Sequence, residues 1–157
     1  MIKAIISDFS RVILFPKDTN YLGGLNNLHK ELSQKPDYKA LDHFNLNIEL
    51  LDFYKSLQDK TLFHIFTTDS IQDSHEFQQY LQPIFSKVLS AKKMNVDKKD
   101  PGSYKSVATQ LKLKPNEILY IDDTPDNVQA ARAAGFNTVI YTDNTTLFRS
   151  VKEILGL

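Results

Sequence analysis

The sequence contains no cysteine among its 157 residues. This absence excludes disulfide bonds, zinc sites built on thiolates and a cysteine nucleophile. The chain also lacks an excess of charge of either sign, because 19 basic residues balance 19 acidic residues and the formal net charge is zero. Dedicated nucleic-acid-binding proteins usually carry a basic excess. We therefore expect no nucleic-acid partner.

Long hydrophobic runs are also missing. The chain has no uninterrupted apolar stretch long enough for a membrane-spanning helix. Residues 1–6 include a lysine and meet Asp8 too early to form a secretory signal. We therefore expect a cytoplasmic protein that has no membrane partner. The length of the chain fits one domain with a complete hydrophobic core.

The most informative stretch is residues 118–136, which read ILYIDDTPDNVQAARAAGF. Its first four residues form a short apolar run, typical of a parallel strand that is buried on both faces. Asp122 and Asp123 follow this run, and Thr124 suits the cap of a helix that ends at Gly135. The pattern predicts a strand, an acidic loop, a helix and a further strand, as in a parallel α/β sheet.

The same alternation of apolar runs and amphipathic stretches continues along the rest of the chain. We expect strands at residues 2–6, 61–66, 87–89, 118–121 and 136–141, and helices at residues 21–32, 47–57, 76–85, 103–111 and 145–155. Residues 92–100 are expected to form a charged loop. In the helix at residues 47–57, the apolar spacing predicts that Ile48, Leu51, Tyr54 and Leu57 face the core. The pattern predicts a Rossmann-like three-layer α/β sandwich with a parallel sheet of about five strands.

Polar side chains stand at or just beyond the ends of three predicted strands, namely Asp8, Thr67 and the pair Asp122 and Asp123. The carboxyl ends of parallel strands share one sheet edge, where ligands bind. Two adjacent carboxylates repel each other unless a cation lies between them. An aspartate can attack phosphorus, while Mg²⁺, a hydroxyl group and an ammonium such as that of Lys98 offset the phosphoryl charge. The pattern predicts a phosphate site, although acids placed for the dipole of a helix are an alternative explanation of the pair.

The order of these residues resembles that of the haloacid dehalogenase-like (HAD) superfamily of phosphatases and related hydrolases. Asp8 in IISDFS matches the first motif, and Thr67 in IFTTDS matches the second. Lys98 in KKDP is similar to the third motif, and IDDTPDNVQAARAAG is very similar to the fourth. The resemblance covers nearly the whole chain. It implies one HAD-like domain over residues 1–157, with a small cap-like insertion at about residues 17–45.

The resemblance also implies roles for the matching residues. Asp8 would be the nucleophile that forms an aspartyl-phosphate. Mg²⁺ would be bound by Asp8, by the backbone carbonyl of Ser10 and directly by Asp123. Asp122 would support the waters of the metal ion, and Asn127 would assist.

The remaining expectations concern the phosphorylated substrate, which is a small molecule or a macromolecule. Thr67 and Lys98 would hold the transferring phosphoryl oxygens. Thr68 is a further candidate for substrate contact, although a turn at the end of a strand explains it equally well. With only about 30 residues available for a cap, we expect a site that is open to solvent.

Two residues depart from the family pattern in the first motif. Ser10 stands where the family usually has an aspartate that acts as general acid and base, and Arg11 stands where glycine is usual. The leading interpretation is a Mg²⁺-dependent phosphatase-like hydrolase. The alternative is a catalytically impaired relative with a binding or regulatory role, which Ser10 favours. A phospho-acceptor receiver domain fits poorly, because its acidic pair ends the first strand and its lysine follows the last.

Overall fold

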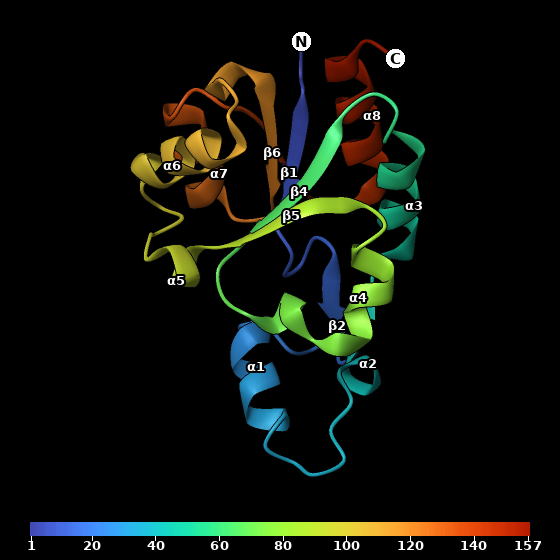
Figure 1. The fold of residues 1–157 in the computed structure, drawn as a ribbon. Helices are drawn as coiled ribbons and strands as arrows, with labels where there is room; N and C mark the ends of the chain where they lie inside the picture. The colour runs from blue at the N-terminus through green and yellow to red at the C-terminus, as the bar shows by residue number, and fades with distance from the viewer.

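A five-stranded parallel sheet forms the centre of the computed structural model, which describes residues 1–157 (Figure 1). Its strands are β1 (Ala4–Ser7), β4 (Leu62–Thr67), β5 (Phe85–Ser90), β6 (Ile118–Asp122) and β7 (Asn137–Ile140). They lie in the order β5-β4-β1-β6-β7, and every neighbouring pair is parallel. The predicted Rossmann-like α/β sandwich with about five strands is confirmed.

Helices cover both faces of the sheet (Figure 1). One face carries α5 (Ala91–Met94), α6 (Pro101–Leu111) and α7 (Pro125–Ala133), and the other carries α3 (Ile48–Ser56), α4 (His75–Leu81) and α8 (Asn144–Leu155). Successive side chains of a strand point to opposite faces, so in β1 the side chain of Ile5 joins one core cluster and that of Ile6 joins the other. This burial on both faces explains the unbroken apolar runs of the strands. No helix of the structure is both long enough and apolar enough to cross a bilayer.

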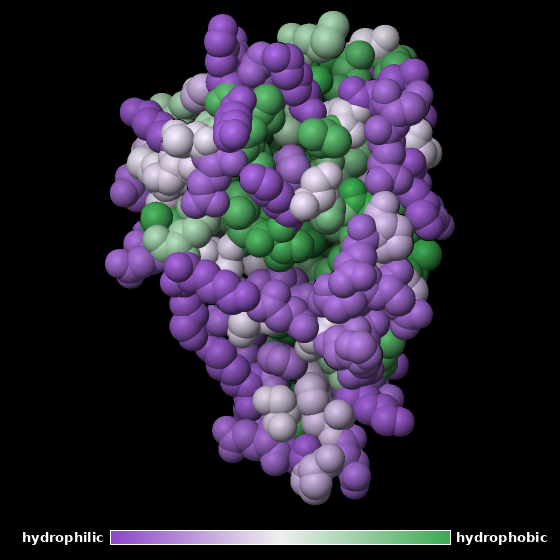
Figure 2. All heavy atoms as spheres, in the orientation of Figure 1, coloured by the Kyte–Doolittle hydropathy of each residue, from purple (hydrophilic) through white to green (hydrophobic).

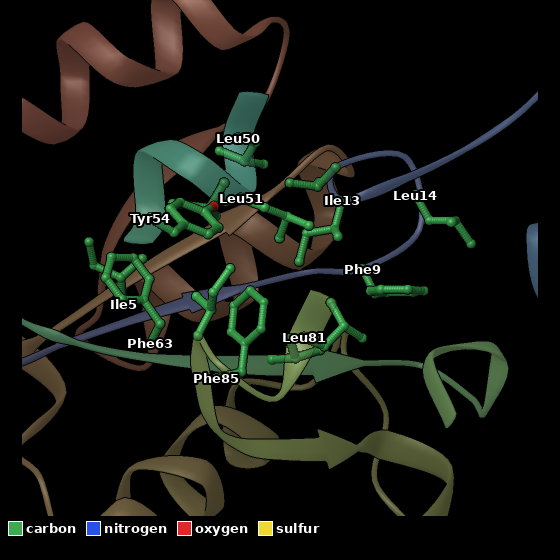
Figure 3. Close-up of a cluster of buried hydrophobic side chains, with 14 of the residues drawn as sticks. Ile5, Phe9, Ile13, Leu14, Leu50, Leu51, Tyr54, Phe63, Leu81 and Phe85 are labelled. Carbon is green, nitrogen blue, oxygen red and sulfur yellow. The ribbon is translucent and has the colours of Figure 1, made fainter. Parts of the chain in front are cut away.

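The larger core cluster lies between the sheet and the helices α3, α4 and α8, and it is rich in aromatic rings (Figure 3). Tyr54 of α3 is completely buried, and its ring centroid lies 4.8 Å from that of Phe63 in β4. Its hydroxyl donates a hydrogen bond to Oγ of Ser7, 3.2 Å away. Tyr54 therefore joins the apolar core to the last residue of β1, immediately before Asp8.

The structure corrects the predicted inward face of α3. Leu51, Tyr54 and Leu57 are buried as expected, but Ile48 is 46% exposed and Leu50 is buried instead. Asn47 caps the helix by accepting a hydrogen bond from the backbone N–H of Leu50. Residues advance by about 100° around a helix, so Ile48 falls outside the arc that Leu50 and Tyr54 share.

Other differences concern short elements. A two-stranded antiparallel sheet of β2 (Leu14–Pro16) and β3 (Phe44–Leu46) was not predicted. The expected helix at residues 21–32 begins later, as α1 (Leu25–Leu32), because two glycines precede it. The helix expected at residues 76–85, which Pro83 is expected to end early, ends at Leu81, and the start of the expected charged loop forms the short helix α5.

Residues 17–45 run from the end of β2 into β3, at the lower end of the molecule in Figure 1. They contain α1 and the short helix α2 (Ala40–His43). The backbone N–H groups of Ala40 and Leu41 donate to the carboxylate of Glu76, at 2.7 and 3.1 Å. Figure 2 shows that this end is mostly hydrophilic, whereas apolar atoms gather higher on the same face, at the level of β5.

The buried face of α3 makes a testable prediction for stability. Leu51→Ala should lower the free energy of unfolding by about 2–5 kcal/mol, because it leaves a cavity in the core. Ile48→Ala, the matched control on the same helix, should cost less than about 1 kcal/mol because Ile48 is half exposed. Urea unfolding of both variants measures the difference. Equal losses would mean that Ile48 belongs to the core.

Candidate active site

Asp8 follows β1, the central strand, at the C-terminal edge of the sheet. Figure 1 shows that this edge faces α1. It directly follows Ser7, which pairs with Ile65 of β4 on one side and with Ile121 of β6 on the other. The backbone N–H of Asp8 donates to the carbonyl of Ile121 at 2.8 Å. The central position of β1 therefore places the Asp8 carboxylate between the ends of β4 and β6.

Lys98 links Asp8 to the acidic pair. Its Nζ lies 2.9 Å from Oδ1 of Asp8 and 2.8 Å from Oδ2 of Asp122, and all three residues are buried. The ammonium also lies 5.5 Å from the centre of the Phe66 ring. Burial disfavours the charged lysine, but the two carboxylates outweigh that effect and raise the pKa of Lys98 above its ordinary value. Lys98 is therefore a permanent cation at this edge.

Asp122 is fully buried, and both of its carboxylate oxygens accept hydrogen bonds from the protein. Oδ1 accepts from the backbone N–H of Thr124 at 2.8 Å, and Oδ2 accepts from Nδ2 of Asn127 at 3.1 Å and from the hydroxyl of Tyr120. Burial alone would raise the pKa of Asp122, but Lys98 and the hydrogen bonds from Tyr120 and Thr124 outweigh it and lower that pKa. Asp122 is an ionised carboxylate that is held in place by its neighbours.

Asp8, Asp122 and Asp123 form a group of carboxylates whose nearest oxygens lie within 4.8 Å of one another. Burial, together with the charge of Asp122, raises the pKa of Asp8 to about 7 and that of Asp123 to about 6, although Lys98 opposes the shift of Asp8. Raised values mean that the negative charges are incompletely compensated by the protein. Oxygen donors with surplus negative charge suit a hard cation such as Mg²⁺, so the residues fit the ion.

A cavity of about 340 Å³ opens beside these carboxylates. Only one of its twelve lining residues is hydrophobic; they are Asp8, Ser10, Arg11, Gly24, Leu25, Asn26, Asn27, Thr68, Asp69, Asp123, Thr124 and Asn127. The first turn of α1 forms part of the wall, so residues 17–45 border the site. A second hollow of about 470 Å³, lined in part by Lys98, adjoins the first and shares Thr68, Asp69, Thr124 and Asn127 with it.

The hydroxyl-bearing residues predicted for the site lie in different environments. Thr68 lines both hollows, whereas Thr67, the last residue of β4, is 1% exposed and lines neither. Ser10 lines the cavity, and its Oγ is buried without a hydrogen-bond partner. Thr124 precedes α7 as predicted, but its hydroxyl makes no capping hydrogen bond. Thr68 and Thr124 therefore line both hollows, whereas the buried Oγ of Ser10 is not exposed to the cavity.

Two tyrosines support the charged centre, whereas the sequence patterns around them predict only a helix at residues 103–111 and a buried strand at residues 118–121. The hydroxyl of Tyr104 in α6 donates to the backbone carbonyl of Lys98 at 2.7 Å, and that of Tyr120 donates to Asp122. The two rings lie 5.1 Å apart in an edge-on arrangement. A buried tyrosine needs a partner for its hydroxyl. That rule is the signal that points to these contacts from the sequence.

Curated relatives match parts of the chain. Bifunctional epoxide hydrolase 2 from Sus scrofa is 27% identical over 126 residues, which cover 76% of this chain and 23% of that protein. Enolase-phosphatase E1 from Persephonella marina is 39% identical over 66 residues, which cover 42% of this chain and 28% of that protein. The chain therefore matches less than a third of the length of either relative.

Solved structures share the fold. A HAD family enzyme from Bacteroides thetaiotaomicron, solved in complex with magnesium and inorganic phosphate, superposes with a TM-score of 0.70 at 17% identity, covering 95% of this chain and 100% of that one. A HAD-superfamily hydrolase of subfamily IA from Geobacter sulfurreducens gives a TM-score of 0.72 at 16% identity, covering 99% and 97% of the two chains.

The family itself is established by a sequence model for haloacid dehalogenase-like hydrolases, which matches residues 22–141. That match includes Thr67, Lys98 and the acidic pair, but it begins after Asp8 and Ser10. In the structure Asp8, which precedes the matched range, lies against Lys98, and Lys98 also pairs with Asp122 within that range. The chain belongs to the haloacid dehalogenase-like hydrolase family.

Proposed function

We propose that the protein is a Mg²⁺-dependent phosphatase that acts through an aspartyl-phosphate on a phosphorylated substrate. The observation that carries this proposal is the group of three carboxylates: Lys98 bridges Asp8 and Asp122, and Asp8 and Asp123 line a polar cavity. The relatives support it, since one is an enolase-phosphatase and one solved enzyme holds magnesium with phosphate.

The carboxylate oxygens suggest which residues would hold the ion. Asp8 uses Oδ1 for Lys98, and Asp123 has only a 3.5 Å contact between its Oδ1 and the hydroxyl of Thr124. Each therefore keeps one oxygen free of protein partners. We assign the metal to Asp8, Asp123 and the backbone carbonyl of Ser10, with Asp122 acting through water. When bound, Mg²⁺ offsets the charges of the nucleophile and of the phosphate.

The chemistry assigned to Asp8 has two steps. A carboxylate oxygen attacks phosphorus, an aspartyl-phosphate forms, and the bond to the leaving oxygen breaks. A water molecule then attacks the phosphorus of the intermediate, which releases inorganic phosphate and regenerates the carboxylate. We assign to Lys98 and Thr68 the role of holding phosphoryl oxygens during both steps, and Thr67 remains a predicted contributor.

Ser10 limits which leaving groups react readily. A serine hydroxyl does not exchange protons readily near neutral pH, so it cannot replace an aspartate as general acid and base. Aryl and acyl phosphates, whose leaving groups need no proton, should react better than alkyl phosphates. The same substitution favours a second candidate function, in which the site binds phosphate and metal without appreciable turnover.

The metal assignment predicts unequal roles for neighbouring carboxylates. Asp123→Asn should lower the affinity for Mg²⁺ at least tenfold, because one of few charged ligands disappears. Asp122→Asn should have a smaller effect, since both of its oxygens already serve the protein. Asp126→Asn, an exposed carboxylate in the first turn of α7, is the matched control and should leave the affinity unchanged. Calorimetric titration that finds equal affinities for wild type and Asp123→Asn would remove Asp123 from the metal site.

Replacement of Ser10 tests whether turnover occurs. Ser10→Asp should raise the hydrolysis of alkyl phosphates by up to about 10²- to 10⁴-fold, and that of aryl phosphates by less, because only alkyl leaving groups depend on protonation. Ser10→Ala controls for the loss of the hydroxyl, and Asp8→Asn defines the background rate. A folded, Mg²⁺-binding Ser10→Asp protein that stays at the background rate would favour the binding role. Equal wild-type rates for alkyl and aryl phosphates would contradict this account of Ser10.

A further inference from the structure

Arg11 holds a backbone conformation that favours glycine. Its φ is +61°, in the left-handed region, which is unfavourable for a residue with a Cβ atom. Its backbone N–H donates to the carbonyl of Leu14 at 2.7 Å, which closes the turn after Asp8. Strained non-glycine residues of this kind concentrate at functional sites. An arginine that is kept in such a position three residues from Asp8 therefore points to a role for its side chain.

The guanidinium of Arg11 is only partly used by the protein. Its Nη2 donates to the backbone carbonyls of Tyr21 and Gly23, at 3.0 and 2.8 Å. A guanidinium has five N–H donors, so these two bonds leave the donors of Nη1 and Nε without a partner in the protein. Arg11 also forms no ion pair, although the neighbouring Asp69 is paired with Lys30 at 2.5 Å and with Lys92 at 3.5 Å. The Arg11 side chain is a fixed cation with free donors.

Arg11 lies close to the proposed nucleophile, Asp8, because both residues line one cavity. Arg11 lines the same cavity as Asp8 and Asp123, together with the side chain of Asn27, which makes no hydrogen bond within the protein. A phosphoryl group on Asp8 would leave the rest of the substrate in this cavity. A neutral apolar leaving group gains little binding free energy from these polar lining residues. An anionic leaving group gains charge-assisted hydrogen bonds to the guanidinium.

We propose that Arg11 selects phosphate monoesters whose leaving group carries a second anionic group, either a carboxylate or another phosphate. This inference rests on the proposed phosphatase function, because it assumes that the phosphoryl group sits at Asp8. A competing location for the second anionic group is the neighbouring hollow, where Lys92 and Lys99 are exposed. That hollow lacks Asp8 and Asp123 among its lining residues, so the cavity of Arg11 is the better placed of the two.

Binding to the Asp8→Asn protein in the presence of Mg²⁺ tests the proposal without turnover. The probes are the phosphate ester of 3-hydroxypropionate and n-propyl phosphate, which differ in a terminal carboxylate against a methyl group. Calorimetry should show that the carboxylate ester binds at least tenfold more tightly. A further Arg11→Gln substitution should abolish that preference and leave the affinity for n-propyl phosphate within about twofold. Lys99→Gln, the control in the neighbouring hollow, should leave the preference intact.

A second control separates recognition by the guanidinium from anchoring of α1. Oδ1 of Asn26 accepts hydrogen bonds from the backbone N–H groups of Ser70 and Ile71, at 3.2 and 3.0 Å. Asn26→Ala therefore loosens α1 while Arg11 stays in place, and it should retain most of the preference. If Asn26→Ala abolishes the preference as fully as Arg11→Gln does, the placement of α1 selects the substrate and the proposal is wrong.

Other results of these titrations would also support or overturn the role of Arg11. Loss of the preference in Lys99→Gln would place the second anion in the neighbouring hollow and overturn the role of Arg11. Equal affinity for both esters in the Asp8→Asn protein would overturn the inference and leave the phosphatase proposal standing. Failure of both esters to bind to the wild type as well as to the Asp8→Asn protein would overturn the phosphate site itself. A clear preference for the carboxylate ester without turnover by the wild type would support the role of Arg11 and reject catalysis.

Discussion

The ion pairs of Lys98 are the interaction on which the candidate site depends. Its ammonium joins Asp8, which follows the central strand, to Asp122, which ends the neighbouring strand β6. A buried carboxylate without a compensating charge is destabilising, so Lys98 offsets the burial of both aspartates at this edge. The hydroxyls of Tyr104 and Tyr120 in turn hold the backbone of Lys98 and the carboxylate of Asp122. The charged centre is therefore fixed by the apolar layer beneath it.

The sequence predicts the sheet well because its central strands are buried on both faces and read as unbroken apolar runs. The order of polar residues after these strands likewise indicates which side chains share the edge. Features set by tertiary contacts are harder to foresee. The strands β2 and β3 have three residues each and lie far apart in the chain, so no local pattern indicates their pairing. The exposure of Ile48 depends on where α3 lies on the sheet, and the bonds of Arg11 go to backbone carbonyls, which every residue offers.

Residues 17–45 border the site because several contacts tie α1 to the sheet edge. Arg11 holds the chain before α1, Asn26 accepts from the backbone after Asp69, and Lys30 pairs with the carboxylate of Asp69. These bonds connect the segment to the loops that follow β1 and β4. We infer that the segment acts as a small cap along one side of the cavity. The other side stays accessible through the hollow beside Lys98, an arrangement compatible with a bulky substrate.

The central claim is that Asp8 accepts a phosphoryl group, and mass spectrometry of the quenched protein tests it most directly. Wild-type protein mixed with Mg²⁺ and an aryl phosphate, quenched in acid within the first turnovers and digested, should yield a peptide in which Asp8 carries one phosphoryl group. The modification should accumulate because Ser10 is a poor base for its hydrolysis. It should be absent from Asp8→Asn. Turnover of the aryl phosphate without any phosphoryl group on Asp8, or equal turnover by Asp8→Asn, would contradict the account.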